Sequence, residues 1–131
     1  MSNNAQLVIP LAEFKNIVVT VTEDAEGKLK PSCIETILCN NPDTLINFQI
    51  ANPTTAESDY RFEMPRVTGD VEQLSDFVIS LSGKMLTVCN ANTEPGKINI
   101  TLKVYDYVTP QNRGELDPEV ANQPLGAQYC R

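Results

Sequence analysis

Apolar and polar residues alternate along most of this chain. Between residues 97 and 105, Ile98, Ile100, Leu102 and Val104 occupy every second position, and mainly polar residues lie between them. A period of two places the apolar side chains on one face of a β-strand, so this segment is predicted to be a half-buried strand. The same alternation predicts strands at residues 17–22, 46–50 and 60–64.

A hairpin is predicted for residues 76–81 and 84–90. The Ser82-Gly83 dipeptide between them suits a two-residue turn. With that turn, Ile79 lies opposite Leu86, and the apolar residues of both strands fall on the same face.

Three segments have less regular patterns. Residues 32–39 are apolar on both faces, which predicts a central strand, with a short helix as the alternative. Residues 7–11 contain Pro10, so they are predicted to be an edge strand or an irregular lead-in. Residues 106–131 are more polar, and are predicted to be an extended strap with one edge strand through Val120.

Clusters of turn-forming residues separate the predicted strands at regular spacing, and no long amphipathic helix is present in the pattern. About seven or eight short strands of this kind are typical of an antiparallel β-sandwich or barrel. Residues 1–131 are therefore predicted to form a single all-β domain.

The net charge is −7, from ten Lys and Arg against 17 Asp and Glu. Nucleic acids and anionic membrane surfaces attract basic proteins, so we expect neither as a partner. The apolar runs are too short to span a bilayer, and the first residues lack the basic and apolar parts of a signal peptide. We therefore expect a soluble, cytoplasmic protein without a membrane partner.

Histidine is absent from the chain. A Ser-His-Asp or Cys-His arrangement cannot be built without it, and neither can a metal site that needs imidazole. Carboxylates, Lys, Tyr or Cys can catalyse reactions alone, but no motif of that type is present. We expect a protein that is not an enzyme and needs no cofactor.

Four cysteines lie at Cys33, Cys39, Cys89 and Cys130, without the close pairs of a zinc site. We expect free thiols, as in most cytoplasmic proteins, with an inter-sheet disulfide between Cys39 and Cys89 as the alternative. Cys130, close to the end of the chain, is expected to be exposed.

Acidic residues gather in loops, where Asp24 and Glu26 precede Gly27, and Asp70 and Glu72 lie close together. Carboxylate oxygens at such spacing are weak candidates for Ca²⁺ ligands, although no calcium-loop pattern is present. Solvated acidic loops are the alternative, and the interpretation we prefer for a chain of pI 4.5.

Two tyrosines near the end of the predicted strand at residues 97–105 are candidate contact residues. Tyr105 points away from the apolar face, so Tyr105 and Tyr107 could form a patch that binds a ligand or partner. The alternative, which we prefer, is that tyrosines cap the edges of the core.

The C-terminal part resembles a known family. Residues 117–124 read Asp-Pro-Glu-Val-Ala-Asn-Gln-Pro and follow a strand and a loop. This arrangement is similar to the end of the small bacterial proteins grouped as the DP-EP family. The resemblance implies a single immunoglobulin-like β-sandwich and brings no catalytic residues.

Two function classes remain. The first is a non-catalytic binding or assembly module that acts through a sheet face or edge, by self-association or with a protein partner. We favour it because Thr- and Asn-rich strands can pair with a second copy. The alternative is a small-ligand or carbohydrate-binding domain that uses the loops at one end, lined by Tyr105, Tyr107 and acidic residues, with or without Ca²⁺.

Overall fold

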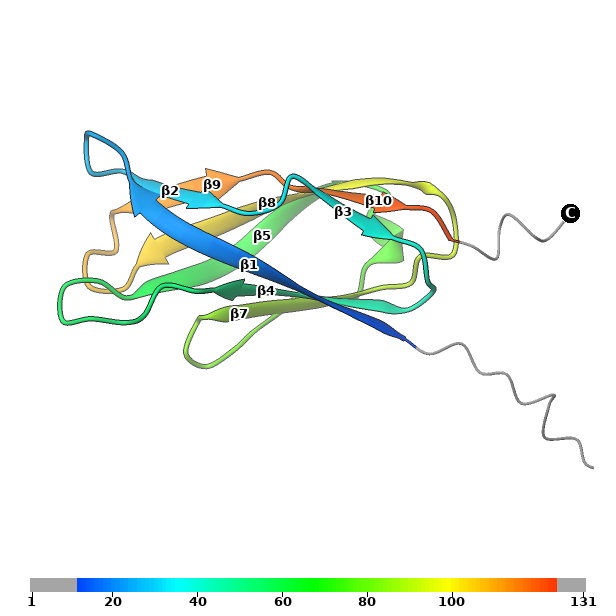
Figure 1. Cartoon of the computed structure of the whole chain (residues 1–131), viewed down its shortest axis with the longest axis horizontal. Coiled ribbons are helices and arrows are strands. Elements are labelled where there is room, and N and C mark those ends of the chain that lie inside the picture. Colours follow the sequence, from blue (N-terminus) through cyan, green and yellow to red (C-terminus); the bar gives the residue numbers. More distant parts are fainter. Residues whose placement is uncertain (1–11, 125–131) are drawn as a thin grey trace, which may run out of the picture.

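The computed structural model describes residues 12–124, which form two β-sheets packed face to face (Figure 1). The described residues contain no α-helix, and only a short 3-10 turn, η2 (Val71–Gln73), interrupts the strands. The strands are β1 (Glu13–Glu23), β2 (Leu29–Ser32), β3 (Thr36–Cys39), β4 (Thr44–Ile50), β5 (Tyr60–Gly69), β6 (Val78–Ile79), β7 (Met85–Asn90), β8 (Gly96–Asp106), β9 (Arg113–Leu116) and β10 (Glu119–Asn122). The all-β prediction is confirmed.

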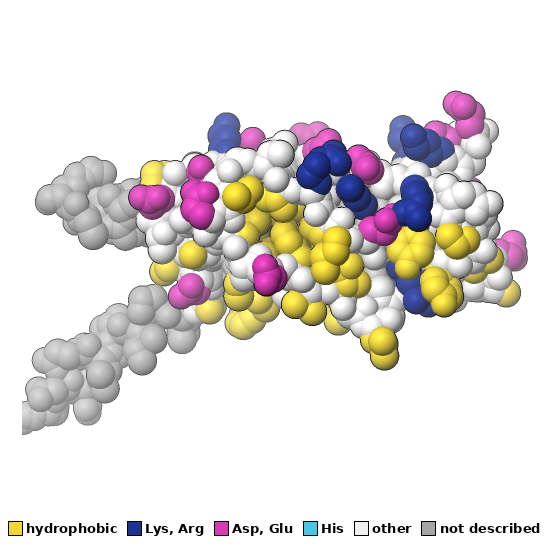
Figure 2. Space-filling view, turned by 180° about the vertical axis from the view of Figure 1, so that it is seen from behind, with side chains coloured by type: hydrophobic (Ala, Val, Ile, Leu, Met, Phe, Trp, Pro, Cys, Tyr) yellow, Lys and Arg dark blue, Asp and Glu magenta, His cyan; other side chains and the backbone are white. Residues whose placement is uncertain are grey.

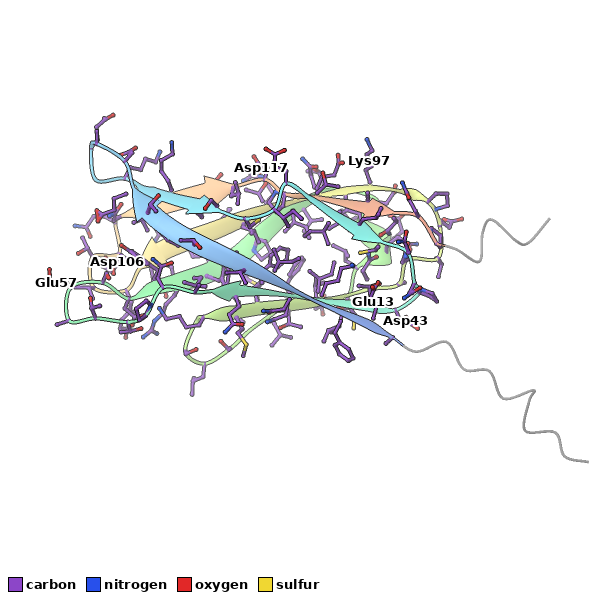
Figure 3. The ribbon with its side chains drawn as sticks, viewed as in Figure 1. Glu13, Asp43, Glu57, Lys97, Asp106 and Asp117 are labelled. Atoms are coloured by element: carbon purple, nitrogen blue, oxygen red, sulfur yellow. The ribbon has the colours of Figure 1, made fainter. Side chains whose placement is uncertain are left out.

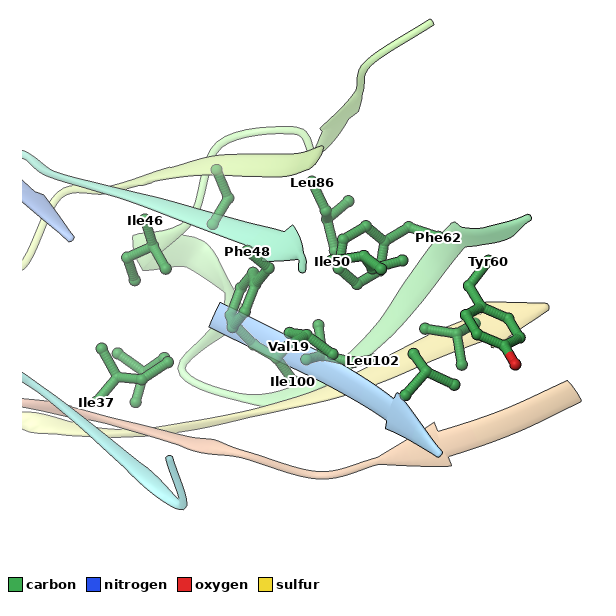
Figure 4. Close-up of a cluster of buried hydrophobic side chains, with 14 of the residues drawn as sticks. Val19, Ile37, Ile46, Phe48, Ile50, Tyr60, Phe62, Leu86, Ile100 and Leu102 are labelled. Carbon is green, nitrogen blue, oxygen red and sulfur yellow. The ribbon is translucent and has the colours of Figure 1, made fainter. Parts of the chain in front are cut away.

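The first sheet has the strand order β2-β1-β4-β7-β6, and the second has the order β3-β10-β8-β5, with β9 also paired to β8. The core lies between the two sheets, and Figure 4 shows Phe48 and Leu86 from the first packed with Ile100 and Leu102 from the second. The alternation between residues 97 and 105 is confirmed, because the four apolar side chains of that strand are fully buried.

Two features of the predicted architecture are wrong. The sheets are mixed, because β1 pairs with β4 and β3 pairs with β10 in parallel. The described residues form ten strands, above the seven or eight that the turn spacing predicted. The number rises because β2 and β3 replace the one strand predicted for residues 32–39, and because β9 precedes the predicted strand through Val120.

Residues 32–39 form no central strand. Ser32 ends β2, which pairs with β1 in the first sheet, whereas β3 pairs with β10 in the second. The chain therefore crosses between the sheets at residues 33–35. The apolar residues on the second face of this segment, Ile34 and Leu38, are exposed rather than buried.

The C-terminal segment is also more regular than a strap. β9 and β10 pair with successive parts of β8, and Pro118 lies between them. A strand does pass through Val120, which is fully buried, but it has β3 on one side and β8 on the other. The prediction of an edge strand is therefore wrong, because β3 covers that edge.

The predicted hairpin register is confirmed, since Ile79 lies opposite Leu86. The turn is longer than predicted, because the Ser80 amide donates to the Met85 carbonyl and residues 81–84 form the loop. Gly83 adopts a φ of +78° and packs against the Arg61 side chain. The predictions for residues 7–11 and for Cys130 lie outside the described residues.

Candidate functional site

The outward side chains of β1, β4 and β7 form a three-by-three grid without a charged residue. The strand registers align Phe14, Leu45 and Cys89 in one row, Asn16, Asn47 and Thr87 in the next, and Val18, Gln49 and Met85 in the third. We call these nine residues the uncharged face. Val78 of β6, opposite Thr87, extends it by one apolar side chain.

Hydrogen bonds connect the polar side chains of this face. Thr87 Oγ1 donates to Asn47 Oδ1 at 2.8 Å, and Asn47 Nδ2 donates to Asn16 Oδ1 at 2.8 Å. Asn16 Nδ2 in turn donates to Gln49 Oε1 at 3.3 Å. Removing water from polar groups that already have hydrogen-bond partners costs less free energy than removing it from unpaired groups. Burying the polar row in an interface should therefore cost little free energy.

The two remaining rows expose apolar surface. The exposed fractions are 74% for Phe14, 53% for Val18 and 41% for Met85. Large side chains at such exposure, gathered on one face, are typical of interaction surfaces.

The outer face of the second sheet is different. Its strands carry eight charged side chains of both signs: Arg61, Glu63, Arg66, Lys97, Lys103, Arg113, Glu115 and Glu119. Figure 2 shows the molecule from behind, with most dark blue and magenta side chains in the upper half and yellow ones across the middle and along the lower border. Charged side chains are therefore more frequent on the second sheet.

The edges formed by β5, β6, β3 and β2 are poorly suited to adding a strand. Pro65 interrupts the edge of β5, where the pairing with β8 shifts between Glu63 and Arg66. β6 has two residues and β3 has four. Along β2, Gly114 of β9 lies so close that an added Cβ would be 2.3 Å from the Leu29 carbonyl oxygen. Short, bulged or covered edges resist strand addition. The edge of β1 over residues 13–19 differs, because β2 pairs with β1 only from Thr20 to Glu23.

The candidate contact residues Tyr105 and Tyr107 lie at the loop end of β8, each below an arginine. The Arg61 guanidinium is 3.7 Å from the centre of the Tyr107 ring, and that of Arg113 is 5.6 Å from Tyr105. Tyr107 is 56% exposed, so it does not cap the core. Whether this pair contacts a ligand or partner stays a prediction.

Asp59 fixes the arginine above Tyr107. Its carboxylate accepts hydrogen bonds from Arg61 at 2.8 and 3.2 Å and lies 3.0 Å from the Lys84 ammonium. The hydrogen bonds from Arg61 lower the pKa of Asp59 to about 2, with Lys84 contributing in the same direction against the effect of burial. Asp59 thereby joins the loop before β5 to the β6–β7 turn.

The four candidate calcium ligands do not meet. Asp24 and Glu26 lie in the β1–β2 turn, whereas Asp70 and Glu72 lie beside η2 at the opposite end of the molecule (Figure 1). Asp24 Oδ1 accepts from the amides of Glu26 and Lys28, and the bond from Lys28 is the main reason that its pKa is lowered. Among the described residues, no three carboxylates or thiols are grouped to hold a metal ion.

The described cysteines are free, as expected. Cys39 is fully buried and Cys89 is exposed on the uncharged face, so the alternative disulfide between them is absent. Burial raises the pKa of Cys39 and raises that of Cys33 to about 11. Neither of these two thiols is prepared for nucleophilic chemistry.

Sequence reasoning recognised the alternation in β1 and β4 but missed the uncharged face. The missing information was the parallel pairing that places Asn16 beside Asn47. A period of two identifies the outward residues of each strand and says nothing about which strands are neighbours. The sequence did contain one signal for this face. The outward positions of three predicted strands carry no charged residue, although the chain as a whole is acidic.

No family model and no curated protein matches the chain. Within residues 12–124, no helix has both the length and the apolar character needed to cross a membrane.

Proposed function

We propose that the protein is a non-catalytic assembly module that associates with a second copy of itself through the uncharged face. The observation that supports this proposal is a grid of nine neutral outward side chains on a chain with a net charge of −7. The cytoplasm is the location that we propose for it.

Charge selects the surface through which two copies can meet. Copies of like charge repel each other, and burying charged side chains requires removal of their water. Contact through the uncharged face does not dehydrate any of its side chains in an ionised form, because none of them is charged. It also buries the exposed side chains of Phe14, Val18 and Met85. Burial of apolar surface then favours association by roughly 25 cal/mol per Å².

The pattern of the grid is self-complementary. A two-fold axis in the plane of contact and along the strands places each row on itself, so that Gln49 meets Gln49 and Val18 meets Met85. The nine residues lie on three strands about 4.8 Å apart and extend over five residues of about 3.3 Å each, so the face measures roughly 250 Å² per copy. A dimer through this face would bury about 500 Å², less than a stable interface usually buries, so we expect weak association.

We also infer that the two packed sheets form an immunoglobulin-like β-sandwich, as the resemblance of residues 117–124 to the DP-EP family implies. The two layers and the buried core between them support this inference.

Two valine substitutions test the proposed interface. Val18, on the uncharged face, is 53% exposed, and Val108, beside Tyr107, is 50% exposed. Both Val18→Lys and Val108→Lys add one positive charge at a similarly exposed site, so both should fold, and both reduce the net negative charge by one. Analytical ultracentrifugation of reduced protein then compares their self-association with that of the unsubstituted chain.

We expect Val18→Lys to be a monomer and Val108→Lys to dimerise like the unsubstituted chain. Loss of the dimer in Val108→Lys alone would indicate that the interface lies at the surface around Tyr107 and Val108. Equal dimerisation of both variants would refute the uncharged face as the interface.

A further inference from the structure

A polar pocket lies at the end of the molecule where β1 ends and the loops before β5 and before β9 meet. Its volume is about 440 Å³, enough for a small organic molecule. Figure 3 shows Asp106 and Glu57, two of its lining residues, at this end. Local hydrogen bonds hold its walls, because Thr55 Oγ1 accepts from the Ser58 amide at 3.0 Å and Asn112 Nδ2 donates to the Gly27 carbonyl at 3.0 Å.

Two nearly buried polar side chains line this pocket. Asp106 is 6% exposed, and its Oδ1 accepts from the Asp59 and Val108 amides at 3.0 Å each. Its Oδ2 has no hydrogen-bond partner among the described residues. The Tyr60 side chain is 9% exposed, and its hydroxyl likewise has no partner in residues 12–124. In Figure 4 this hydroxyl points away from the buried cluster.

The charge of the lining is negative. Glu23 and Glu57 join Asp106, and neither Lys nor Arg is present among the lining residues. Asp106 Oδ2 and the oxygen of the Tyr60 hydroxyl are not fully buried, so both are accessible to a molecule in the pocket. The pocket therefore presents unused acceptors and unbalanced negative charge to whatever enters it.

We propose that this pocket binds a small organic cation of the alkylammonium class. An ammonium group carries three donors and one positive charge, which match Asp106 Oδ2, the oxygen of the Tyr60 hydroxyl and the rim carboxylates. A metal ion fits less well, because no three acidic side chains are grouped closely enough among the described residues. This site lies on loops, apart from the uncharged face, so it is independent of self-association.

The linear diamine putrescine is a suitable probe, with butanediol as the uncharged analogue of the same chain length. Titrations followed by amide chemical shifts report where each probe binds. Asp106→Asn keeps the acceptor for the two backbone amides and removes the charge, and Tyr60→Phe removes only the hydroxyl. Glu72→Gln removes one carboxylate at the opposite end of the molecule and serves as the matched control.

We expect putrescine to shift the amides of residues 55–60 and 106–112 saturably, and butanediol to leave them unchanged. Asp106→Asn should weaken binding about tenfold, and Glu72→Gln should have no effect. Equal binding of butanediol would show that the pocket recognises hydroxyl groups and not positive charge, which would overturn the proposal. Equal weakening by Glu72→Gln would show that only the net charge attracts the probe, and unchanged binding by Asp106→Asn would exclude this pocket.

Discussion

The side-chain amides of Asn90 and Asn122 exchange two hydrogen bonds, 2.7 and 3.1 Å long, between the two sheets. Asn90 is fully buried at the end of β7, and Asn122 is 2% exposed at the end of β10. Each amide thus supplies the donor and the acceptor that the other needs. This pair connects β7, a strand of the uncharged face, to β10 of the second sheet.

The amide pair predicts a large effect of removing one member. Asn122→Ala leaves the buried Asn90 amide without its partner, so the free energy of unfolding should fall by about 2–3 kcal/mol. Urea unfolding measures this change. Asn99→Ala, on the exposed face of β8, should change it by less than about 0.5 kcal/mol.

A double substitution separates pairing from general damage. In Asn90→Ala with Asn122→Ala neither side-chain amide of the pair is left without its partner, and only the Asn92 N–H loses its acceptor, Asn90 Oδ1. The combined loss should therefore be smaller than the sum of the two single losses. Simple additivity would show that the two amides do not act as a pair.

Stability should depend on Asp59 in acid. Its pKa is about 2 in the folded protein, below its ordinary value of 3.8, so its ionised form stabilises the fold above about pH 4. As the pH falls from about 4 to 2, this contribution of about 1–2 kcal/mol should disappear. Unfolding curves of the unsubstituted chain and of Asp59→Asn should therefore converge in this range. A constant difference between them would contradict the role of the ion pairs with Arg61 and Lys84.

The contact between β9 and β2 predicts a cost for any side chain at position 114. In Gly114→Ala the added Cβ would lie 2.3 Å from the Leu29 carbonyl oxygen, so the strands must separate. We expect a loss of about 2–3 kcal/mol in the free energy of unfolding. Gly27→Ala, whose Cβ would meet only Glu23 Oε1 at 3.8 Å, should lose about 1–2 kcal/mol from its φ of +81° alone. An equal loss in both variants would argue against the close approach of β9.

Cys89 gives a chemical probe of the proposed interface. It is the exposed thiol of the uncharged face, whereas Cys39 is fully buried. In a Cys130→Ser background, iodoacetamide should modify Cys89 first, and its rate should fall several-fold as the protein concentration rises. The Val18→Lys variant should show no such protection. Mass spectrometry of the alkylated peptides measures both rates.

Salt should strengthen the self-association. At 0.15 M the Debye length is about 8 Å, so the repulsion between two copies of charge −7 is largely screened, whereas apolar burial is retained. The dissociation constant should therefore fall between low and physiological ionic strength in sedimentation experiments. An increase would indicate contact through salt bridges instead.

The sequence alone predicts much of the fold. Alternation identified β8 and the core position of Ile100, and the turn preference of Ser82-Gly83 correctly paired Ile79 with Leu86. These are local signals, because each depends on neighbours within a few residues. The break after Ser32 was missed. An apolar residue such as Ile34 has the same pattern in sequence whether it is exposed on a crossover or belongs to a strand buried on both faces.

The candidate sites were harder to predict. The uncharged face depends on the parallel pairing of β1 with β4, and residues on those strands are about thirty positions apart in sequence. The polar pocket requires Tyr60 and Asp106 to meet at one end, which no periodicity indicates. Sequence did predict that Tyr105 points away from the apolar face, but the arginine above it comes from a different strand, β9.

Self-association through the uncharged face is the central claim, and the solution mass of the unsubstituted chain tests it most directly. Light scattering on a size-exclusion column, with reduced protein at physiological salt and rising concentration, measures that mass. The account predicts a shift from the chain mass of 14.5 kDa toward twice that value. A mass that stays at 14.5 kDa up to the highest soluble concentration would contradict it.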